Sequence, residues 1–145
     1  MENLPKVLIG GKFIDGVIPL INDAKNSIDI IVYDWRIYPD APSHPVNRLN
    51  AALFSALARG VNIRALVNHS VVKDFLISVG IKARMLDSKK ILHAKSMLID
   101  RRYSICGSHN YTQGGMILNH EISLAVDLGT EKNLLAVYFD NLYGL

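Results

Sequence analysis

Six residues between positions 93 and 110 place nucleophilic, cationic and hydrogen-bonding groups close together in the chain. They follow the pattern H-x-K-x4-D-x6-G-S-x-N, with His93, Lys95, Asp100, Gly107, Ser108 and Asn110 at its fixed positions. A histidine can act as a nucleophile or carry a proton, and a lysine supplies positive charge. Serine and asparagine add neutral hydrogen-bond donors. Such a set suits chemistry on a phosphodiester and leaves no obvious place for a metal ion.

Two predicted strands hold this pattern together. The apolar character of Lys95–Ile99 predicts one strand, and Tyr103–Cys106 predicts the next. Arg101 and Arg102 fall at the turn between them. For Asp100, just before that turn, we favour a structural role, in which it pairs with a basic residue and fixes the hairpin.

The predicted hairpin explains how separated residues reach one site. Residues two apart in an extended segment point to the same side, so His93 and Lys95 are neighbours. Ser108 and Asn110 repeat this spacing just after the second strand. Gly107 has the structural role of permitting close approach of the backbone there. We therefore expect the two pairs to face each other.

The pattern resembles the HKD signature of the phospholipase D superfamily at every signature position. The likeness extends to Glu121, which in such proteins commonly stands at the start of a strand and orients the catalytic histidine. In particular, the chain resembles the small bacterial endonucleases that carry one motif and act as homodimers. These enzymes cut DNA, and often RNA, with little sequence preference, which fits binding dominated by phosphate contacts. The resemblance implies a phospholipase D-like single domain.

The same resemblance implies how the site is completed. One histidine cannot attack phosphorus and protonate the leaving oxygen at once, and this chain has a single H-x-K. Small superfamily members with one copy build the site across a two-fold axis. We therefore expect a homodimer with the active site at its interface and no cofactor.

Each residue of that site has an implied role. His93 of one subunit forms a phosphohistidine, and His93 of the other donates a proton to the leaving oxygen. Lys95 and Asn110 bind the non-bridging oxygens, and Ser108 adds a hydrogen bond. Glu121 holds the His93 ring by its second nitrogen.

The composition of the whole chain is that of a globular protein. It has 145 residues, of which half are apolar and 20% are charged, so we expect one domain over residues 1–145. No apolar run reaches the roughly 18–20 residues that span a bilayer, so we expect no stable membrane insertion. The N-terminal segment does not read as a signal peptide, and the single cysteine, Cys106, fits a reducing compartment. Both features favour the cytoplasm.

Basic residues concentrate around the motif. The net charge of the chain is only +3, but positions 82 to 102 hold seven lysines and arginines against two aspartates, an excess of +5. Such a patch favours a polyanion, although an ordinary solvated edge can have the same composition. Within it, Lys89, Lys90, Arg101 and Arg102 are the predicted substrate contacts.

The segment from Asp34 to Pro45 is a second candidate for substrate binding. Its three prolines keep it out of regular structure. It follows the carboxyl end of a predicted strand, where open α/β sheets usually bind ligands. Trp35, Arg36 and Tyr38 are placed to line a groove and stack on bases. The alternative, that Trp35 and Tyr38 cover the edge of the core, is equally open.

Strand and helix patterns alternate along the rest of the chain. Further strands are predicted over residues 27–33, 61–67, 81–86 and 121–126. Helices are predicted over residues 16–24, 46–59 and 71–79, from Tyr111 to Met116, and up to Tyr143 from a cap at Thr130. This alternation predicts the α/β class, with a mixed β-sheet flanked by helices on both faces.

Two other functions stay open. A phospholipid phosphodiesterase of the phospholipase D type needs an exposed apolar rim or an amphipathic surface helix, and the sequence does not assign one. A nucleic-acid-binding module without turnover does not need a complete set of motif residues. No metal site is expected, because neither H-x-x-x-H nor C-x-x-C occurs. Of the other histidines, we expect His109 to be structural, and His69 is a candidate for the same cleft.

Overall fold

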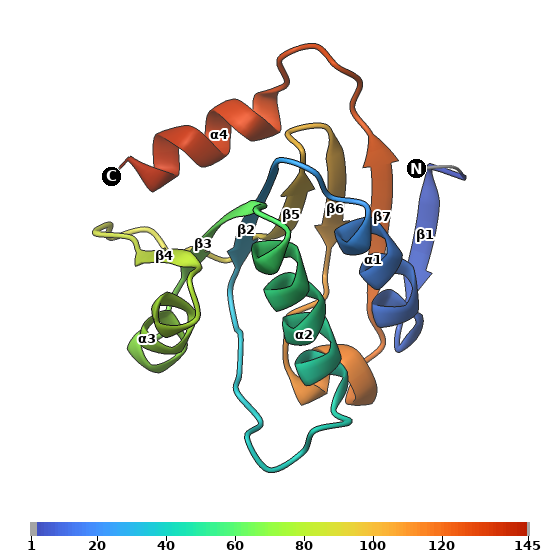
Figure 1. Ribbon diagram of the computed structural model, residues 1–145, viewed down its shortest axis with the longest axis vertical. Coiled ribbons are helices and arrows are strands. Elements are labelled where there is room, and N and C mark those ends of the chain that lie inside the picture. Colours follow the sequence, from blue (N-terminus) through green and yellow to red (C-terminus); the bar gives the residue numbers. More distant parts are fainter. Residues whose placement is uncertain (1–2, 145) are drawn as a thin grey trace.

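Seven strands form one sheet in the computed structural model, which describes residues 3–144 (Figure 1). Residues 1, 2 and 145 of the predicted domain lie outside the described residues. The strands are β1 (Lys6–Ile9), β2 (Ser27–Val32), β3 (Asn62–Val67), β4 (Lys82–Met85), β5 (Lys95–Ile99), β6 (Tyr103–Gly107) and β7 (Ile122–Asp127). The helices are α1 (Lys12–Asn22), α2 (Pro45–Ala58), α3 (Ser70–Ser78) and α4 (Leu134–Tyr143), with a short π-helix, η1 (Gly114–Leu118).

The sheet is mixed, as predicted. Its strand order is β1-β7-β6-β5-β2-β3-β4. β2, β3 and β4 run parallel, and every other neighbouring pair is antiparallel. The predicted hairpin is present, with Ile99 of β5 opposite Tyr103 of β6. The molecule thus joins a parallel half, which needs helical crossovers, to an antiparallel half that holds the motif.

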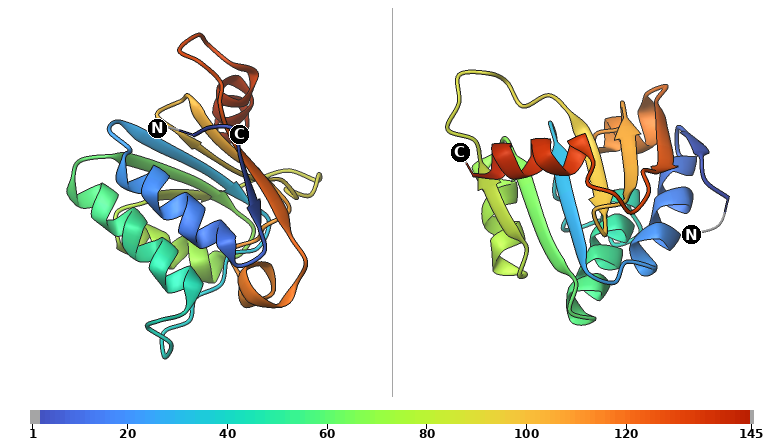
Figure 2. Two further views of the ribbon diagram at one scale, coloured as in Figure 1. Left: turned by 90° about the vertical axis from the view of Figure 1, so that its right-hand side faces the viewer. Right: turned by 90° about the horizontal axis from the view of Figure 1, so that it is seen from above.

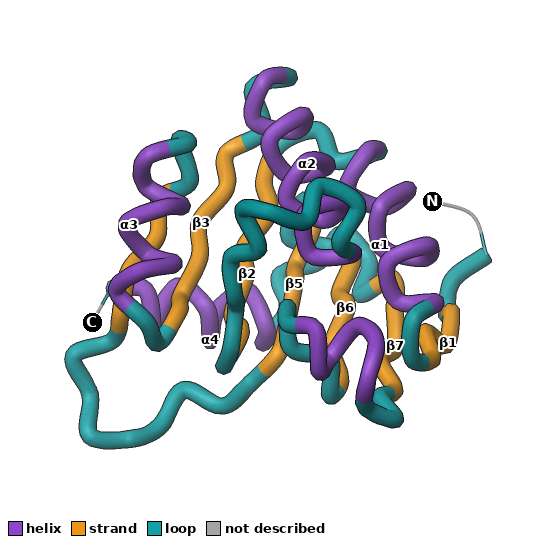
Figure 3. Tube along the Cα trace, turned by 90° about the horizontal axis from the view of Figure 1, so that it is seen from below, coloured by secondary structure: helices purple, strands orange, loops and turns teal. Residues whose placement is uncertain are grey.

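Helices cover both faces of this sheet, which confirms the predicted fold class. α1, α2 and α3 pack on one face, and α4 crosses the other face (Figures 2 and 3). The central strand β2 is buried on both sides. Its Ile28 and Ile30 belong to the main core with α1 and α2, whereas Ile31 packs with Phe139 of α4. The nearly continuous apolar run of this strand is what burial on both faces requires.

The last helix begins later than predicted. Its cap is Asn133, whose Oδ1 accepts a hydrogen bond from the N–H of Ala136 at 2.9 Å, so the prediction of Thr130 as the cap is wrong. The Asn133 Nδ2 also donates to the carbonyl of Arg101 at 2.8 Å. The start of α4 is therefore set by contact with the motif hairpin, which is a tertiary interaction that the local sequence pattern does not contain.

Two elements differ from the prediction in kind. The edge strand β1 is not predicted, because only Leu8 of its four residues is buried and the hydrophobic alternation is too short to detect. The segment predicted to be helical from Tyr111 forms a turn followed by the π-helix η1. The other elements agree with the prediction apart from their ends, and α1 begins at Lys12 instead of Gly16. Within residues 3–144, no helix combines the length and the apolar character needed to cross a membrane.

Candidate active site

The antiparallel half of the sheet brings the motif residues to one end of the molecule. Val32 at the end of β2 pairs with Lys95 at the start of β5. Gly107 at the end of β6 pairs with Ser123 near the start of β7. His93 precedes β5, so the residues before β5 and β7 lie at the same end as those after β2 and β6. Figure 3 views the molecule from this end.

His93 and Lys95 contact each other, as their spacing predicts. The Lys95 Nζ lies 3.2 Å from Nδ1 and 3.4 Å from Nε2 of the His93 ring. Because an ammonium group only donates hydrogen bonds, a ring nitrogen must carry no proton in order to accept one from Lys95. Tyr33, the residue after β2, flanks the pair, with its ring centroid 4.7 Å from that of His93. The imidazole is therefore exposed but confined on one side by an aromatic ring.

Asn110 is held in place by the loop that follows β2. Its Oδ1 accepts a hydrogen bond from the N–H of Asp34 at 3.1 Å, which leaves the Nδ2 group as the donor side. The next residue is tied to the same loop, because the N–H of Tyr111 donates to the Asp34 carbonyl at 3.0 Å. A side chain at Gly115 would lie 2.2 Å from the Asn110 carbonyl, so η1 can approach this residue only because position 115 is glycine.

Ser108 and Gly107 join the motif to the start of β7. The Ser108 Oγ accepts from the N–H of Ile122 at 3.0 Å and donates to the Ile122 carbonyl at 3.2 Å. A Cβ at Gly107 would lie 2.4 Å from that same carbonyl. The structure gives both residues a positioning role, since the hydroxyl proton of Ser108 is directed at the backbone.

Glu121 does not contact His93 within one chain. Its Oε1 accepts a hydrogen bond from the Asn119 Nδ2 at 3.3 Å, and no hydrogen bond joins Glu121 to His93 among residues 3–144. The resemblance implied that a glutamate at this position orients the histidine. The single chain does not provide that contact, because the His93 nitrogens face Lys95 instead.

Asp100 lies at the opposite end of β5 from the candidate site and has a structural environment. Its carboxylate accepts hydrogen bonds from the backbone N–H groups of Lys25, Asn26 and Ser27, at 3.0, 2.7 and 3.0 Å. Asp100 itself has a positive φ of 51°. The carboxylate therefore fixes the chain entering β2 to the motif hairpin, and the partners are backbone amides, whereas the sequence suggested a basic side chain.

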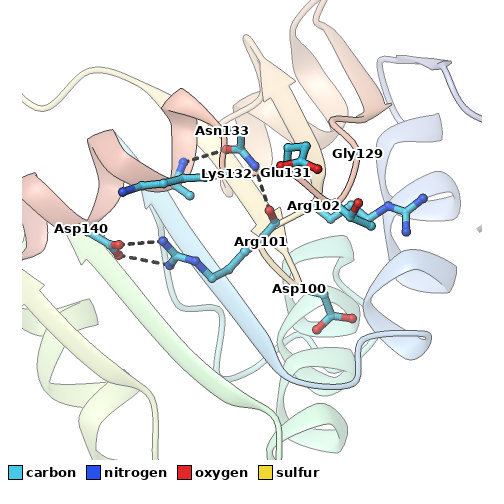
Figure 4. Close-up of a pocket in the computed structure, with 10 residues that line it drawn as sticks. Asp100, Arg101, Arg102, Gly129, Glu131, Lys132, Asn133 and Asp140 are labelled. Carbon is cyan, nitrogen blue, oxygen red and sulfur yellow. Dashed lines mark hydrogen bonds and ion pairs between the residues drawn. The ribbon is translucent and has the colours of Figure 1, made fainter.

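Arg101 and Arg102 are not at the candidate site, which corrects the prediction that they bind substrate. They lie in the β5–β6 turn, roughly 15 Å along β5 from Lys95. Arg101 Nη2 contacts Asp140 of α4 at 2.6 Å (Figure 4). Arg102 Nη2 contacts Asp127 at 2.7 Å. The open pocket there, of about 590 Å³, is lined by these paired arginines. The turn of a hairpin lies one strand length away from the open end of the hairpin, where Lys95 and Gly107 are. Arg101 and Arg102 are therefore close to the motif in sequence but far from the candidate site in space.

Trp35 is also unavailable to substrate, which decides between the two roles left open for it. Its side chain is 2% exposed, and its Nε1 donates to the Asn50 Oδ1 at 3.2 Å. Its ring packs edge-on against Tyr111 at 5.1 Å. Trp35 therefore supports the segment that carries Asn110. The neighbouring Arg36 is exposed but pairs with Asp34 at 2.7 Å.

The predicted contacts Lys89 and Lys90 are exposed near the site. They lie in the segment that connects β4 to His93, which crosses beneath β3 and β2 in Figure 3. Their positions leave the prediction of a substrate role open. Sequence reasoning did not select Tyr33, although its place directly after a buried strand that borders the motif was a usable signal.

His109 is structural, as expected from its position between Ser108 and Asn110. Its ring is buried and stacks on Phe13 with 4.3 Å between centroids. Burial lowers the pKa of this histidine. The neutral ring fits its partners, since Nε2 donates to the Gly10 carbonyl at 2.9 Å and Nδ1 can accept from the Ser123 hydroxyl at 2.7 Å. His109 thus anchors the motif to the start of α1.

Comparison with known proteins identifies the family of this fold and site. A family profile described as "Cardiolipin synthase, PLD-like domain" matches residues 17–143. The chain belongs to the phospholipase D superfamily. Its fold matches Nuc, a phospholipase D family member from Salmonella typhimurium, with a TM-score of 0.76, 21% identity and coverage of 97% of this chain and 95% of that chain. NucT from Helicobacter pylori matches with a TM-score of 0.75, 20% identity and coverage of 97% and 96%.

A relative found by sequence similarity is named for a different activity. Cardiolipin synthase A from Buchnera aphidicola subsp. Acyrthosiphon pisum is 30% identical over 94 residues, which cover 57% of this chain. The chain spans only 19% of the length of that relative. This phospholipase D superfamily member therefore has the fold of phosphodiester-acting enzymes. Its relatives include proteins of its own size and proteins several times larger.

The site offers a nucleophile, a cation and a neutral donor, and it does not resemble a metal centre. Among residues 3–144, no three histidine, cysteine, aspartate or glutamate side chains converge as metal ligands do. The chemistry that these residues can perform is displacement at phosphorus by the imidazole, with the lysine and the amide binding the negative oxygens.

Proposed function

We propose that this protein is an endonuclease that hydrolyses DNA or RNA without a metal ion, through a phosphohistidine formed in a site shared by two subunits. The observation that carries the proposal is that His93, Lys95 and Asn110 converge at one end of the sheet in a single-domain chain. Its fold matches those of Nuc and NucT over nearly their whole lengths. The exposed Lys89 and Lys90 beside this end support a polyanionic substrate.

In the first half-reaction, a neutral His93 attacks phosphorus. A P–N bond forms, the bond from phosphorus to the leaving oxygen breaks, and His93 of the partner subunit gives its proton to that oxygen. The Lys95 ammonium, which contacts the imidazole here, turns to the non-bridging oxygens when a phosphate is bound. The Asn110 Nδ2 group donates to the same oxygens, because its Oδ1 is already held by the backbone.

In the second half-reaction, water replaces the histidine. His93 of the partner subunit, now neutral, removes a proton from the attacking water, and the P–N bond breaks to release the product and restore the starting imidazole. Because one ring must be neutral and the other protonated, we predict a bell-shaped dependence of kcat on pH. A flat profile between pH 5 and pH 9 would contradict this scheme.

The homodimer follows from the chemistry of a single motif and has support in the surface near it. Ile117 and Leu118 of η1 and Ile122 of β7 surround Glu121 in the chain and are 53%, 69% and 62% exposed. Apolar side chains beside a site are typical of a subunit interface. A dimer would also give Glu121 a histidine to orient, since it does not contact His93 of its own chain.

The same exposed apolar side chains favour a second candidate, a phospholipid phosphodiesterase. They supply the apolar rim that the sequence alone did not assign, and the relative cardiolipin synthase A is named for a lipid product. In this alternative the rim contacts lipid, whereas in the nuclease it contacts the other subunit. A module that binds nucleic acid without turnover stays as a third possibility.

The deciding experiment is a cleavage assay in excess EDTA, on single- and double-stranded DNA, RNA and phosphatidylglycerol vesicles. We expect wild type to cut nucleic acid and His93→Ala to be inactive. Cleavage by His93→Ala as well would indicate a contaminating nuclease. Lys132→Ala, an exposed change at the opposite end of the sheet, controls for unspecific effects of a substitution and should be fully active. Turnover of lipid alone would select the second candidate, and binding without turnover would select the third.

A further inference from the structure

A groove lies directly beside His93. It has a volume of about 310 Å³ and is walled by the ends of β2 and β3 on one side and by the segment before His93 on the other. Tyr33, Asn68 and His69 come from the strand ends, and Lys89, Lys90 and Leu92 come from that segment. This volume is at the lower end of the range of about 300–1,000 Å³ for pockets that bind small ligands. The groove therefore has room for one component of a larger substrate.

The walls of this groove are joined by the side chain of Asn68, which is half-buried. The Asn68 Nδ2 donates to the carbonyl of Tyr33 at 2.8 Å and to the carbonyl of Leu92 at 2.9 Å. One amide thus ties the end of β2 to the segment that leads into His93. The groove is preformed, so a ligand does not have to order its walls.

The groove offers an aromatic surface next to the catalytic histidine. Tyr33 is 37% exposed, its ring lies 4.7 Å from that of His93, and Lys95 Nζ is 5.5 Å from its centroid. An exposed tyrosine at this distance is placed to stack on the base adjacent to a phosphate held by His93 and Lys95. Such stacking contributes about 1–3 kcal/mol per base.

The rim of the groove is positively charged. Lys89 and Lys90 are exposed, and the His69 Nε2 lies 3.7 Å from Asp34, with which it forms an ion pair when protonated. The negative charge of Asp34 is offset by Arg36, whose Nε lies 2.7 Å away. A cationic rim around an aromatic surface suits a nucleotide, whose phosphate and base need these two kinds of contact.

We infer that this groove is a subsite for one unpaired nucleotide next to the scissile phosphate. Tyr33 stacks on its base, and Lys89, Lys90 and His69 bind the phosphate that follows. A base within a duplex has both faces covered by its neighbours and cannot enter such a groove. The protein therefore prefers single-stranded nucleic acid. This inference rests on the proposed nuclease function and specifies its substrate.

The test separates base contacts from phosphate contacts. Binding to the catalytically inactive His93→Ala protein is measured by fluorescence anisotropy with a 12-nucleotide thymidine strand, an abasic strand of equal length and a 12-base-pair duplex. Adding Tyr33→Leu should weaken binding of the thymidine strand by about 5- to 160-fold and leave the abasic strand unchanged. Tyr33→Phe keeps the ring and should bind as His93→Ala alone does. Lys89→Ala with Lys90→Ala should weaken both strands equally and lower the salt dependence.

Three results would overturn the inference. These are an equal effect of Tyr33→Leu on both strands, no effect on either, or duplex bound as tightly as the thymidine strand. Binding to phosphatidylglycerol vesicles that depends on Tyr33, without binding to oligonucleotides, would also overturn it and assign the groove to a lipid headgroup. A failure of the nuclease proposal would give a different result. Wild type would then not cleave nucleic acid, while binding of the thymidine strand would still depend on Tyr33.

Discussion

Trp35 shows that burial decides the role of a residue whose type suits two functions. Its indole is buried and hydrogen-bonded to Asn50, so Trp35→Ala should create a cavity and lower the free energy of unfolding by about 3–5 kcal/mol. Urea denaturation followed by circular dichroism measures this change. Arg36→Ala, at the exposed neighbouring position, should change stability by less than about 0.5 kcal/mol. Unchanged stability of Trp35→Ala together with weaker binding of oligonucleotides would restore its role as a base platform.

Asp100 is part of the motif, but its partners are backbone amides far from the histidine. Asp100→Ala should lower the free energy of unfolding by about 1–3 kcal/mol, since it leaves the N–H groups of Lys25, Asn26 and Ser27 without their acceptor. Asp100→Asn keeps an acceptor oxygen and tolerates the positive φ, so it should lose less. Turnover per folded molecule should be unchanged in both variants. A loss of turnover with full stability would make Asp100 part of the chemistry.

At the scale of elements, η1 positions Asn110 through a contact that only glycine permits. Gly115→Ala would place a methyl group 2.2 Å from the Asn110 carbonyl, so η1 or Asn110 must move. We expect kcat to fall by as much as about 10²–10³-fold, the effect of losing one oxyanion donor. Gly11→Ala is the matched control. Its Cβ would lie 3.5 Å from the carbonyl oxygen of Met116 in η1, which is an ordinary van der Waals contact. Wild-type turnover in Gly115→Ala would show that the placement of Asn110 does not depend on η1.

The turn between β5 and β6 is tied to the end of β7 by a pH-sensitive contact. Hydrogen bonds from Arg102 and then from the Gly129 N–H lower the pKa of Asp127 from 3.8 to about 2. A lowered pKa in the folded state stabilises the protein above the unfolded value and ceases to do so as pH falls. The stability difference between wild type and Asp127→Asn should therefore shrink from pH 4 to pH 2. Thermal unfolding at each pH measures this, with Asp40→Asn, an exposed loop position, as control. A difference that does not change with pH would exclude the contact.

At the scale of the whole molecule, a shared site makes activity depend on both subunits. A mixture of equal amounts of wild type and His93→Ala, allowed to exchange subunits, should contain about one quarter wild-type dimers. Only these dimers have His93 in both subunits. Activity should therefore fall to about half of that of the wild type alone before mixing. Sedimentation velocity of each protein should show a dimer. Activity that is unaffected by the added variant would show that one chain is sufficient.

The sequence by itself determined which residues make up the core of the candidate site and the class of fold. His93, Lys95 and Asn110 lie within positions 93–110, and the predicted hairpin that joins them is built from consecutive strands. Alternation of strands with helices likewise depends on local hydrophobic periodicity, so the mixed sheet with helices on both faces was predictable. These features share one cause, which is that their interactions connect residues close in the chain.

Only the tertiary structure decided which other residues join the site. Tyr33 lies beside His93 because β2 pairs with β5, a contact between residues more than 60 positions apart, such as Val32 and Lys95. The packing of α4 on the sheet likewise decided that Arg101, in the turn between β5 and β6, pairs with Asp140. Hydrophobic patterning specifies that a strand is buried but not which strand lies next to it. Strand neighbours are chosen by the packing of the whole sheet, and so the composition of the site beyond its motif is a property of the folded chain.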